Sequence, residues 1–134
     1  MGNRLLFAIP LAVILGTLSM LHAYWELGGR WASAYTVPTV SGRRLFDPSP
    51  LATWVVCALL ALAALLVLGA LPVVLDLCIA LVFFLRAIGN LRTFGFFKTL
   101  KGTPFSDWDT WLYSPLCLLI AFLAVGVARS PRVR

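Results

Sequence analysis

The chain has 134 residues, of which 61% are hydrophobic and 12% are charged, and its formal net charge is +6. A soluble core of this size could not bury so much apolar surface, so the composition argues against a soluble protein and for one membrane domain, residues 1–134. The basic residues lie mainly between or beyond the apolar runs, and no basic stretch is long enough to follow a phosphate backbone, which argues against nucleic-acid binding.

Four apolar runs follow one another, at about residues 5–25, 51–71, 73–91 and 111–128. Each approaches the roughly 20 residues that a helix needs to cross the hydrocarbon layer. Backbone in lipid must satisfy its hydrogen bonds internally, so each run should be helical. The sequence therefore predicts an all-α, four-transmembrane-helix bundle. Both long connections, near residues 26–50 and 92–110, would emerge on one side of the membrane, opposite the termini.

The first run carries a polar face close to its end. Ser19, His22 and Glu26 are spaced three and four residues apart, so they share one face of a helix. Gly28 and Gly29 follow and are expected to end that helix. We expect His22 to hydrogen-bond Glu26 rather than to hold a metal ion.

The three cysteines, Cys57, Cys78 and Cys117, each lie inside an apolar run. No two of them form a CxxC pair, and no histidine lies near them in sequence. They are expected to pack as small hydrophobic residues, which argues against a thiol–disulfide enzyme and against a zinc site. We expect no metal ion and no cofactor.

The third run carries charge within the predicted membrane span. An ionised side chain there costs about 2.5–3.5 kcal/mol on insertion scales, so it should turn inward and find a partner. Asp76 is expected to anchor the short hairpin at the start of its helix. For Arg86 two readings stay open: it extends to the loop-side surface, or it pairs inside the bundle with a loop-side acid. Those acids are Glu26, Asp107 and Asp109.

The segment FSDWDTWLYSP, residues 105–115, places two of these acids among aromatic rings. Either Asp107 or Asp109 is expected to cap the fourth helix. The rings form either an interfacial aromatic belt or the wall of a pocket that opens from the bilayer. In such a pocket a protonated carboxyl could act as a general acid, and aromatic faces could stabilise a carbocation. The last residues, 130–134, are expected to form a frayed basic tail.

Three motifs resemble the signature of a family of small bacterial four-helix membrane proteins described as a domain of unknown function. They are YWELGG at 24–29, RAIGN at 86–90 and FSDWDTWLYSPLCLL at 105–119. This resemblance implies a multi-pass protein of the bacterial cytoplasmic membrane and names no reaction. The size and layout also resemble small integral-membrane terpene cyclases of actinobacterial indole–terpene and drimane pathways, which start cyclisation by protonation. Asp107-Trp108-Asp109 is similar in part to the aspartate-rich acid motif of soluble cyclases.

The sequence thus favours a membrane enzyme that acts on a prenyl, terpenoid or other lipophilic small molecule, with membrane lipid as its surroundings. Asp107 or Asp109 would donate the proton, and Glu26 would be the second acid or base. The alternative is a non-enzymatic protein, such as a lipid-binding module or a subunit of a transporter or larger complex. The side chains expected to line the pocket are Trp25, Arg86, Asn90, Trp108, Trp111, Tyr113, His22 and Tyr24.

Overall fold

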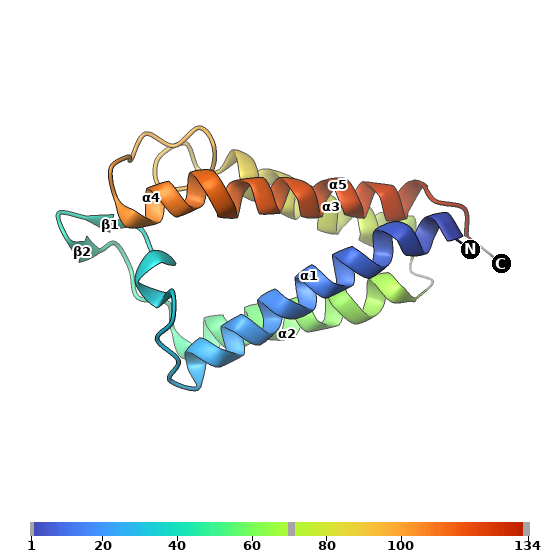
Figure 1. Ribbon diagram of the computed structural model, residues 1–134, viewed down its shortest axis with the longest axis horizontal. Coiled ribbons are helices and arrows are strands. Elements are labelled where there is room, and N and C mark those ends of the chain that lie inside the picture. The colour runs from blue at the N-terminus through green and yellow to red at the C-terminus, as the bar shows by residue number, and fades with distance from the viewer. Residues whose placement is uncertain (1, 70–71, 133–134) are drawn as a thin grey trace.

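The computed structural model describes residues 2–69 and 72–132 (Figure 1). Its helices are α1 (Gly2–Glu26), α2 (Pro50–Leu68), α3 (Val73–Ile88), α4 (Pro104–Trp108) and α5 (Ser114–Arg129). A π-helical turn, η2 (Asp109–Tyr113), joins α4 to α5, so the chain is helical without a break over Pro104–Arg129. The first long loop contains the short helix η1 (Ser33–Tyr35) and an antiparallel hairpin of β1 (Thr39–Val40) and β2 (Arg43–Arg44).

The helices form two pairs. α1 lies along α2, and α3 lies along α5 (Figure 1). α1 also packs against α5 at the end of the molecule where α1 begins and α5 finishes. From there the two pairs diverge toward the opposite end, which carries both long loops. The molecule therefore has a closely packed terminal end and a wider loop end.

The hydrophobic core lies where the two helix pairs meet. Its buried residues are Ala8, Leu11, Leu15, Ala64, Val67, Ala80, Ile120, Leu123, Ala124 and Val127. The small side chains among them allow the helix backbones to approach closely, as is common between helices in membranes. The core thus fixes the terminal end and leaves the loop end to be held by other contacts.

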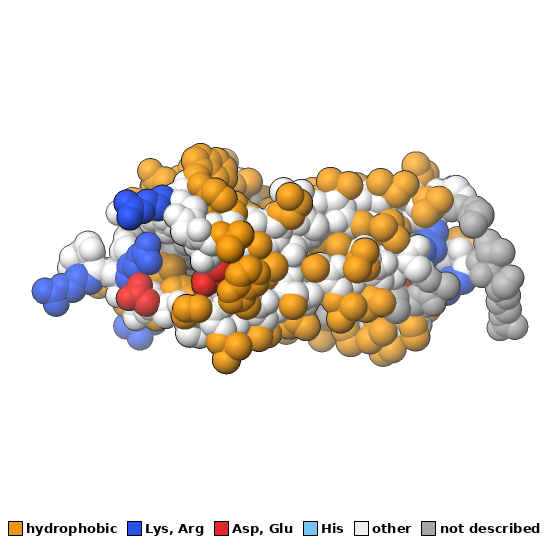
Figure 2. Space-filling model, turned by 90° about the horizontal axis from the view of Figure 1, so that it is seen from below, with side chains coloured by type: hydrophobic (Ala, Val, Ile, Leu, Met, Phe, Trp, Pro, Cys, Tyr) orange, Lys and Arg blue, Asp and Glu red, His pale blue; other side chains and the backbone are white. Residues whose placement is uncertain are grey.

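The outer faces of the helices expose large apolar side chains. Leu6, Leu59 and Phe122 are 70%, 60% and 64% exposed, respectively. Figure 2 shows hydrophobic side chains along the length of the molecule, with charged side chains gathered mainly at the loop end. Three helices, Gly2–Glu26, Pro50–Leu68 and Pro104–Arg129, are long and apolar enough to cross a membrane. These features indicate a membrane protein, because lipid can cover such faces.

The first two helices lie close to their predicted positions. α1 ends at Glu26, and Gly28 follows with a φ of 97°, as expected for a glycine that ends a helix. α2 begins after Ser49, whose side-chain oxygen accepts a hydrogen bond from the backbone N–H of Ala52 at 3.1 Å. The predicted end of this second helix, at residue 71, lies outside the described residues.

The third helix is shorter than predicted. α3 has 16 residues and ends at Ile88, where Gly89 turns the chain with a φ of 85°. At 1.5 Å per residue its length is about 24 Å, less than the roughly 30 Å thickness of the hydrocarbon layer.

The fourth helix begins at Pro104, seven residues before its predicted start. Thr103 caps it, because its side-chain oxygen accepts from the N–H of Ser106 at 3.1 Å and Ser106 Oγ accepts from the N–H of Thr103 at 3.3 Å. This reciprocal arrangement is a capping box. The prediction that Asp107 or Asp109 caps the helix is wrong, because Thr103 occupies the N-cap position and both aspartates follow it inside the helix.

Candidate functional site

A buried charged cluster joins α3, the second long loop and η2. Asp109 is fully buried, and its Oδ1 accepts a hydrogen bond from Arg86 Nη2 at 2.9 Å. Its Oδ2 accepts from the backbone N–H of Gly95 at 2.7 Å and from Lys98 Nζ at 3.0 Å. Hydrogen bonds from two cations stabilise the anionic form of a carboxylate. Of the two readings of Arg86, the structure has the one in which it pairs with a loop-side acid.

The second long loop is organised around Asn90. Its Oδ1 accepts from the backbone N–H groups of Arg92, Thr93 and Phe94 at 3.1, 2.8 and 3.2 Å. Its Nδ2 donates to Thr93 Oγ1 at 2.7 Å. The loop folds back so tightly that a Cβ atom on Gly89 would overlap the carbonyl oxygen of Phe94. The polar atoms of Asn90 are therefore engaged in shaping the loop that carries Gly95 and Lys98.

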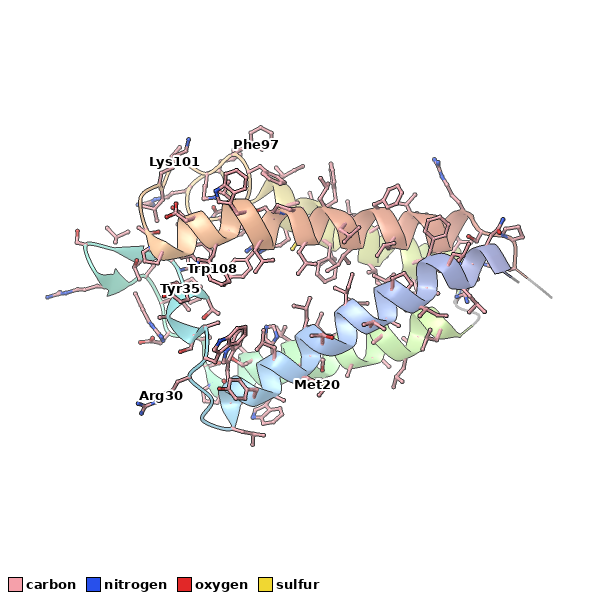
Figure 3. The ribbon with its side chains drawn as sticks, viewed as in Figure 1. Met20, Arg30, Tyr35, Phe97, Lys101 and Trp108 are labelled. Carbon is pink, nitrogen blue, oxygen red and sulfur yellow. The ribbon has the colours of Figure 1, made fainter. Side chains whose placement is uncertain are left out.

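Lys98 is a member of the cluster that the sequence did not reveal. Its side chain is 2% exposed, and its Nζ also donates to Gly95 O at 3.3 Å and to Thr110 Oγ1 at 2.6 Å. In sequence, Lys98 follows Phe96 and Phe97, as an interfacial lysine would. Figure 3 shows Phe97 and the nearby Lys101 on the outside of this loop. No spacing rule connects Lys98 to an acid 11 residues away, so only the folded loop brings them together.

Asp107 and the aromatic residues Trp108, Trp111 and Tyr113 of the 105–115 segment lie outside this cluster. The side chain of Asp107 is exposed and forms no hydrogen bond or ion pair with another described residue. Trp111 is 83% exposed. Trp108 stacks on Tyr35, with ring centroids 5.2 Å apart, and Tyr113 donates from its hydroxyl to Tyr35 O at 3.0 Å (Figure 3). Trp108 and Tyr113 thus attach the first long loop to the fourth helix.

A separate region of polar and aromatic side chains lies between the end of α1, the first long loop and the start of α2. It contains two adjoining cavities of about 190 Å³ and 240 Å³, which we call the loop-end hollow. Both are lined by Trp25, Thr36, Val37, Pro48 and Thr53. The first cavity adds His22, Phe46, Ala52 and Val56, and the second adds Glu26, Gly29, Ser33 and Arg44.

His22 and Glu26 both line the hollow, but the predicted hydrogen bond between them is not formed. His22 Nδ1 donates instead to the carbonyl oxygen of Leu18 at 2.7 Å, because this acceptor one turn earlier lies within reach of the ring. The His22 ring also meets the Trp25 ring edge to face, with centroids 5.3 Å apart. Glu26 is half-buried, and its carboxylate has no hydrogen-bond partner among the residues that the structure describes.

Tyr24 and Trp25 fasten the chain that follows α1. Trp25 Nε1 donates to Trp31 O at 2.8 Å, and the N–H of Trp31 donates to the Tyr24 hydroxyl oxygen at 3.3 Å. Gly29 lies so close to the Tyr24 ring that a Cβ atom there would overlap it. Trp25 faces the hollow, while Tyr24 is 43% exposed and supports the loop from outside the two cavities.

Five of the predicted site residues therefore separate into two places, and the others lie outside both. Glu26, His22 and Trp25 line the hollow, while Arg86 and Asp109 belong to the charged cluster. Neither Asp107 nor Asp109 lines either cavity of the hollow.

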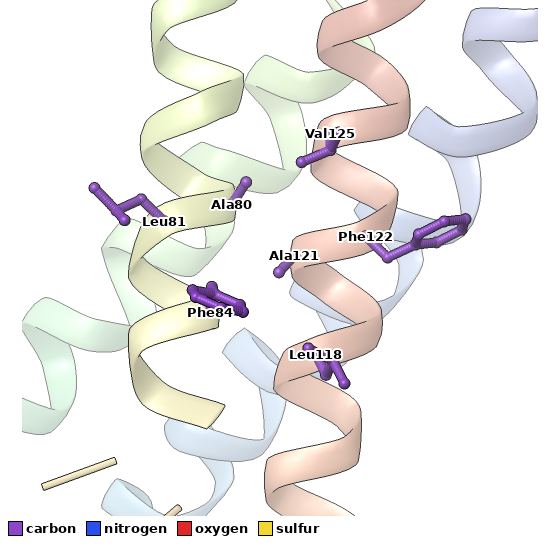
Figure 4. A pocket seen from close by; sticks show the side chains of 7 residues that line it. All are labelled: Ala80, Leu81, Phe84, Leu118, Ala121, Phe122 and Val125. Atoms are coloured by element: carbon purple, nitrogen blue, oxygen red, sulfur yellow. The ribbon is translucent and has the colours of Figure 1, made fainter. Parts of the chain in front are cut away.

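Two further cavities lie elsewhere. A wholly apolar groove of about 470 Å³ runs between α3 and α5 (Figure 4). It is lined by Ala80, Leu81, Phe84, Leu118, Ala121, Phe122 and Val125. A cavity of about 500 Å³ lies between the hairpin and the second long loop, with Asn90 and Arg92 among its lining residues. Neither one is lined by an acidic side chain.

The terminal end carries its own ion pair. Asp76 is fully buried, and its Oδ2 accepts from Arg132 Nη2 at 2.8 Å. Arg4 donates to the carbonyl oxygens of Val67 and Gly69 at the end of α2, the first at 2.9 Å. The expectation of a frayed tail is therefore wrong at Arg132, because a buried carboxylate holds it; residues 133–134 lie outside the described residues.

Comparison with known proteins gives a family and no activity. A family model described as "Protein of unknown function (DUF3995)" matches residues 15–124. No curated protein and no solved structure matches the chain. The match confirms the expected family of unknown function. The resemblance to terpene cyclases finds no support in these comparisons.

Proposed function

Since the chain belongs to the DUF3995 family, whose description assigns no activity, we propose from its geometry that it is a membrane protein that binds a lipophilic small molecule. The loop-end hollow is the binding site. Four helices cross the bacterial cytoplasmic membrane: the three long apolar helices and the shorter helix α3. Both long loops lie on one side.

The observation that carries this proposal is the composition of the hollow. One of its cavities is lined mainly by apolar and aromatic side chains, including Trp25, Phe46 and Val56, and the adjoining one is lined by Glu26 and Arg44. Ligand sites in proteins are mostly apolar, with a small number of polar groups that fix the orientation of the ligand. An elongated molecule with one polar end fits these two cavities, because its apolar part can lie in the first and its polar end in the second.

The charged cluster has a structural role in this proposal. Asp109 links a helix, a loop and the π-helical turn through contacts with Arg86, Gly95 and Lys98. Both of its oxygens accept hydrogen bonds from these partners, and Asp109 lines neither cavity of the hollow, whereas a general acid must reach the substrate. We therefore assign Asp109 to support of the loop end rather than to chemistry.

Photolabelling tests the binding proposal. A 12-carbon alcohol that carries a diazirine would be added to the purified protein in neutral detergent, and the labelled peptides would be located by mass spectrometry. We expect labels on residues of the hollow, within 22–56. Thr53→Trp should reduce this labelling several-fold, because Thr53 lines both cavities and the larger ring would fill them.

Leu59→Trp is the matched control, because it adds the same ring on the exposed face of α2, outside the hollow. It should leave the labelling unchanged. Labels spread evenly over the outer faces of the helices, and unaffected by Thr53→Trp, would contradict the proposal.

An acid-initiated enzyme, such as a terpene cyclase, is the second candidate. Glu26 favours it, because this carboxyl group lines a cavity beside the Trp25 ring, which could stabilise a carbocation. Expression with prenylated candidate substrates, followed by mass spectrometry, would reveal cyclised products. Glu26→Gln should then abolish their formation. If Glu26→Gln, Asp107→Asn and Asp109→Asn all left a detected activity unchanged, this assignment of the acid would be wrong.

A further inference from the structure

Apart from the guanidinium group of Arg44, the side chains of the loop-end hollow offer hydrogen-bond acceptors and few free donors. Thr53 Oγ1 donates to Ser49 O at 3.3 Å, and Ser33 Oγ donates to Arg30 O at 2.9 Å. Thr36 follows the same pattern, with Oγ1 donating to the carbonyl oxygen of Ser33 at 2.8 Å. Each of these hydroxyl hydrogens is occupied by the backbone, so each oxygen faces a ligand as an acceptor.

The ring N–H groups of the hollow also donate to backbone carbonyl oxygens. Trp25 Nε1 donates to Trp31 O. His22 donates from Nδ1 to Leu18 O, so in its neutral form the lone pair on Nε2 is free to accept a hydrogen bond. A donor on a ligand would therefore find several acceptors in the hollow, whereas an acceptor would find Arg44 as its main partner.

The charged side chains of the hollow also favour a ligand that carries a positive charge. The carboxylate of Glu26 has no hydrogen-bond partner among the described residues. Arg44 is the cation that lines the hollow, and its Nη1 lies 3.4 Å from Asp47 Oδ1, so an exposed acid already offsets its charge. The face of the Trp25 ring adds a surface that attracts a positive charge.

We propose, building on the proposed function, that the ligand of the loop-end hollow is a lipophilic amine. Its ammonium group contacts the Glu26 carboxylate and the Trp25 ring, and donates to the free acceptors. Its alkyl part occupies the cavity lined by Phe46, Ala52 and Val56. The amine belongs either to a free amphiphile or to the headgroup of a membrane lipid, and both present the same chemistry to the site.

Competition against the diazirine label tests this inference. Dodecylamine, dodecanol and dodecanoate have the same chain length and differ in the polar end. We expect dodecylamine to displace the label at about a tenfold lower concentration than the other two, a factor equivalent to roughly 1.4 kcal/mol of binding. Glu26→Gln should remove this advantage and leave displacement by dodecanol unchanged.

Asp107→Asn is the control for loss of one negative charge, since Asp107 is exposed and lies outside the hollow. It should leave the advantage of dodecylamine intact. Thermal unfolding would verify that Glu26→Gln, a change that preserves side-chain shape, retains the fold. Adding phosphatidylethanolamine distinguishes the two sources, because a lipid headgroup would compete with dodecylamine and a free amphiphile site would be indifferent to the lipid.

The failures of the two proposals are distinguishable. If the label occupies the hollow but the three competitors are equally potent, or dodecanoate is the best, the amine inference is wrong and the binding site stands. The same holds if Glu26→Gln leaves the potency of dodecylamine unchanged. If no label reaches the hollow, the proposed function itself is wrong.

Discussion

At the scale of single residues, the largest gap between sequence and structure concerns Asp109. The sequence indicated that an acid at this position is close to aromatic rings and that Arg86 needs a partner. It did not indicate Lys98 or the N–H of Gly95, which reach Asp109 through a folded loop rather than along a helix. Periodicity relates residues on one element, so it does not predict contacts that a loop makes between elements.

Asp109→Asn should destabilise the protein strongly. The change leaves Arg86 and Lys98 without their shared anion, and breaking a buried ion pair costs about 3–5 kcal/mol. Because the side chain of Arg86 is 32% exposed, we expect a loss near the lower limit, about 3 kcal/mol. Thermal or chemical unfolding in detergent would measure it. Asp107→Asn should change the unfolding free energy by less than about 0.5 kcal/mol, and equal losses for both variants would contradict this account.

At the scale of elements, the four helices could be predicted from hydrophobic runs, but two boundaries could not. The fourth helix begins at the capping box of Thr103 and Ser106, in a stretch whose polar residues resemble a loop. α3 finishes early because Gly89 and Asn90 reverse the chain, although the apolar pattern continues through Leu91. Hydrophobicity locates a span, whereas backbone geometry sets where its helix stops.

Gly89→Ala should loosen the second long loop. Gly89 has a φ of 85°, and a Cβ atom there would overlap the carbonyl oxygen of Phe94. Gly42→Ala is the matched control, because Gly42 has a φ of 75° but open space around it, so that variant carries the backbone strain without the overlap. We expect trypsin to cleave after Arg92 and Lys98 faster in Gly89→Ala than in Gly42→Ala. Equal cleavage rates would show that this tight contact does not hold the loop.

At the scale of the whole molecule, the packed core joins the helix pairs at the terminal end. At the loop end, the stacking of Tyr35 on Trp108 and the hydrogen bond from Tyr113 to Tyr35 attach the first long loop to the fourth helix. The sequence placed acids, rings and both long loops at one end but predicted a single site. The structure divides these residues between a charged cluster and a hollow, because Glu26 and Asp109 belong to different helix pairs.

Four spans would place both long loops on one side of the membrane. Cysteines introduced at exposed positions 30 and 101, one in each long loop, should react alike with a membrane-impermeant maleimide in intact cells, after the native cysteines are replaced. A cysteine at exposed position 3 should show the opposite reactivity. Different reactivities at positions 30 and 101 would mean that α3 does not cross the membrane.

The central claim is that the loop-end hollow binds a lipophilic amine. Fluorine NMR of the protein labelled with 5-fluorotryptophan tests it most directly, because Trp25 lines both cavities of the hollow. The chain has five tryptophans, and single Trp→Phe variants would assign their signals. On titration with dodecylamine, the account predicts a saturable shift of the Trp25 signal that Glu26→Gln weakens, with little change at Trp54 and Trp111. Saturable shifts confined to Trp54 or Trp111, with Trp25 unaffected, would contradict it.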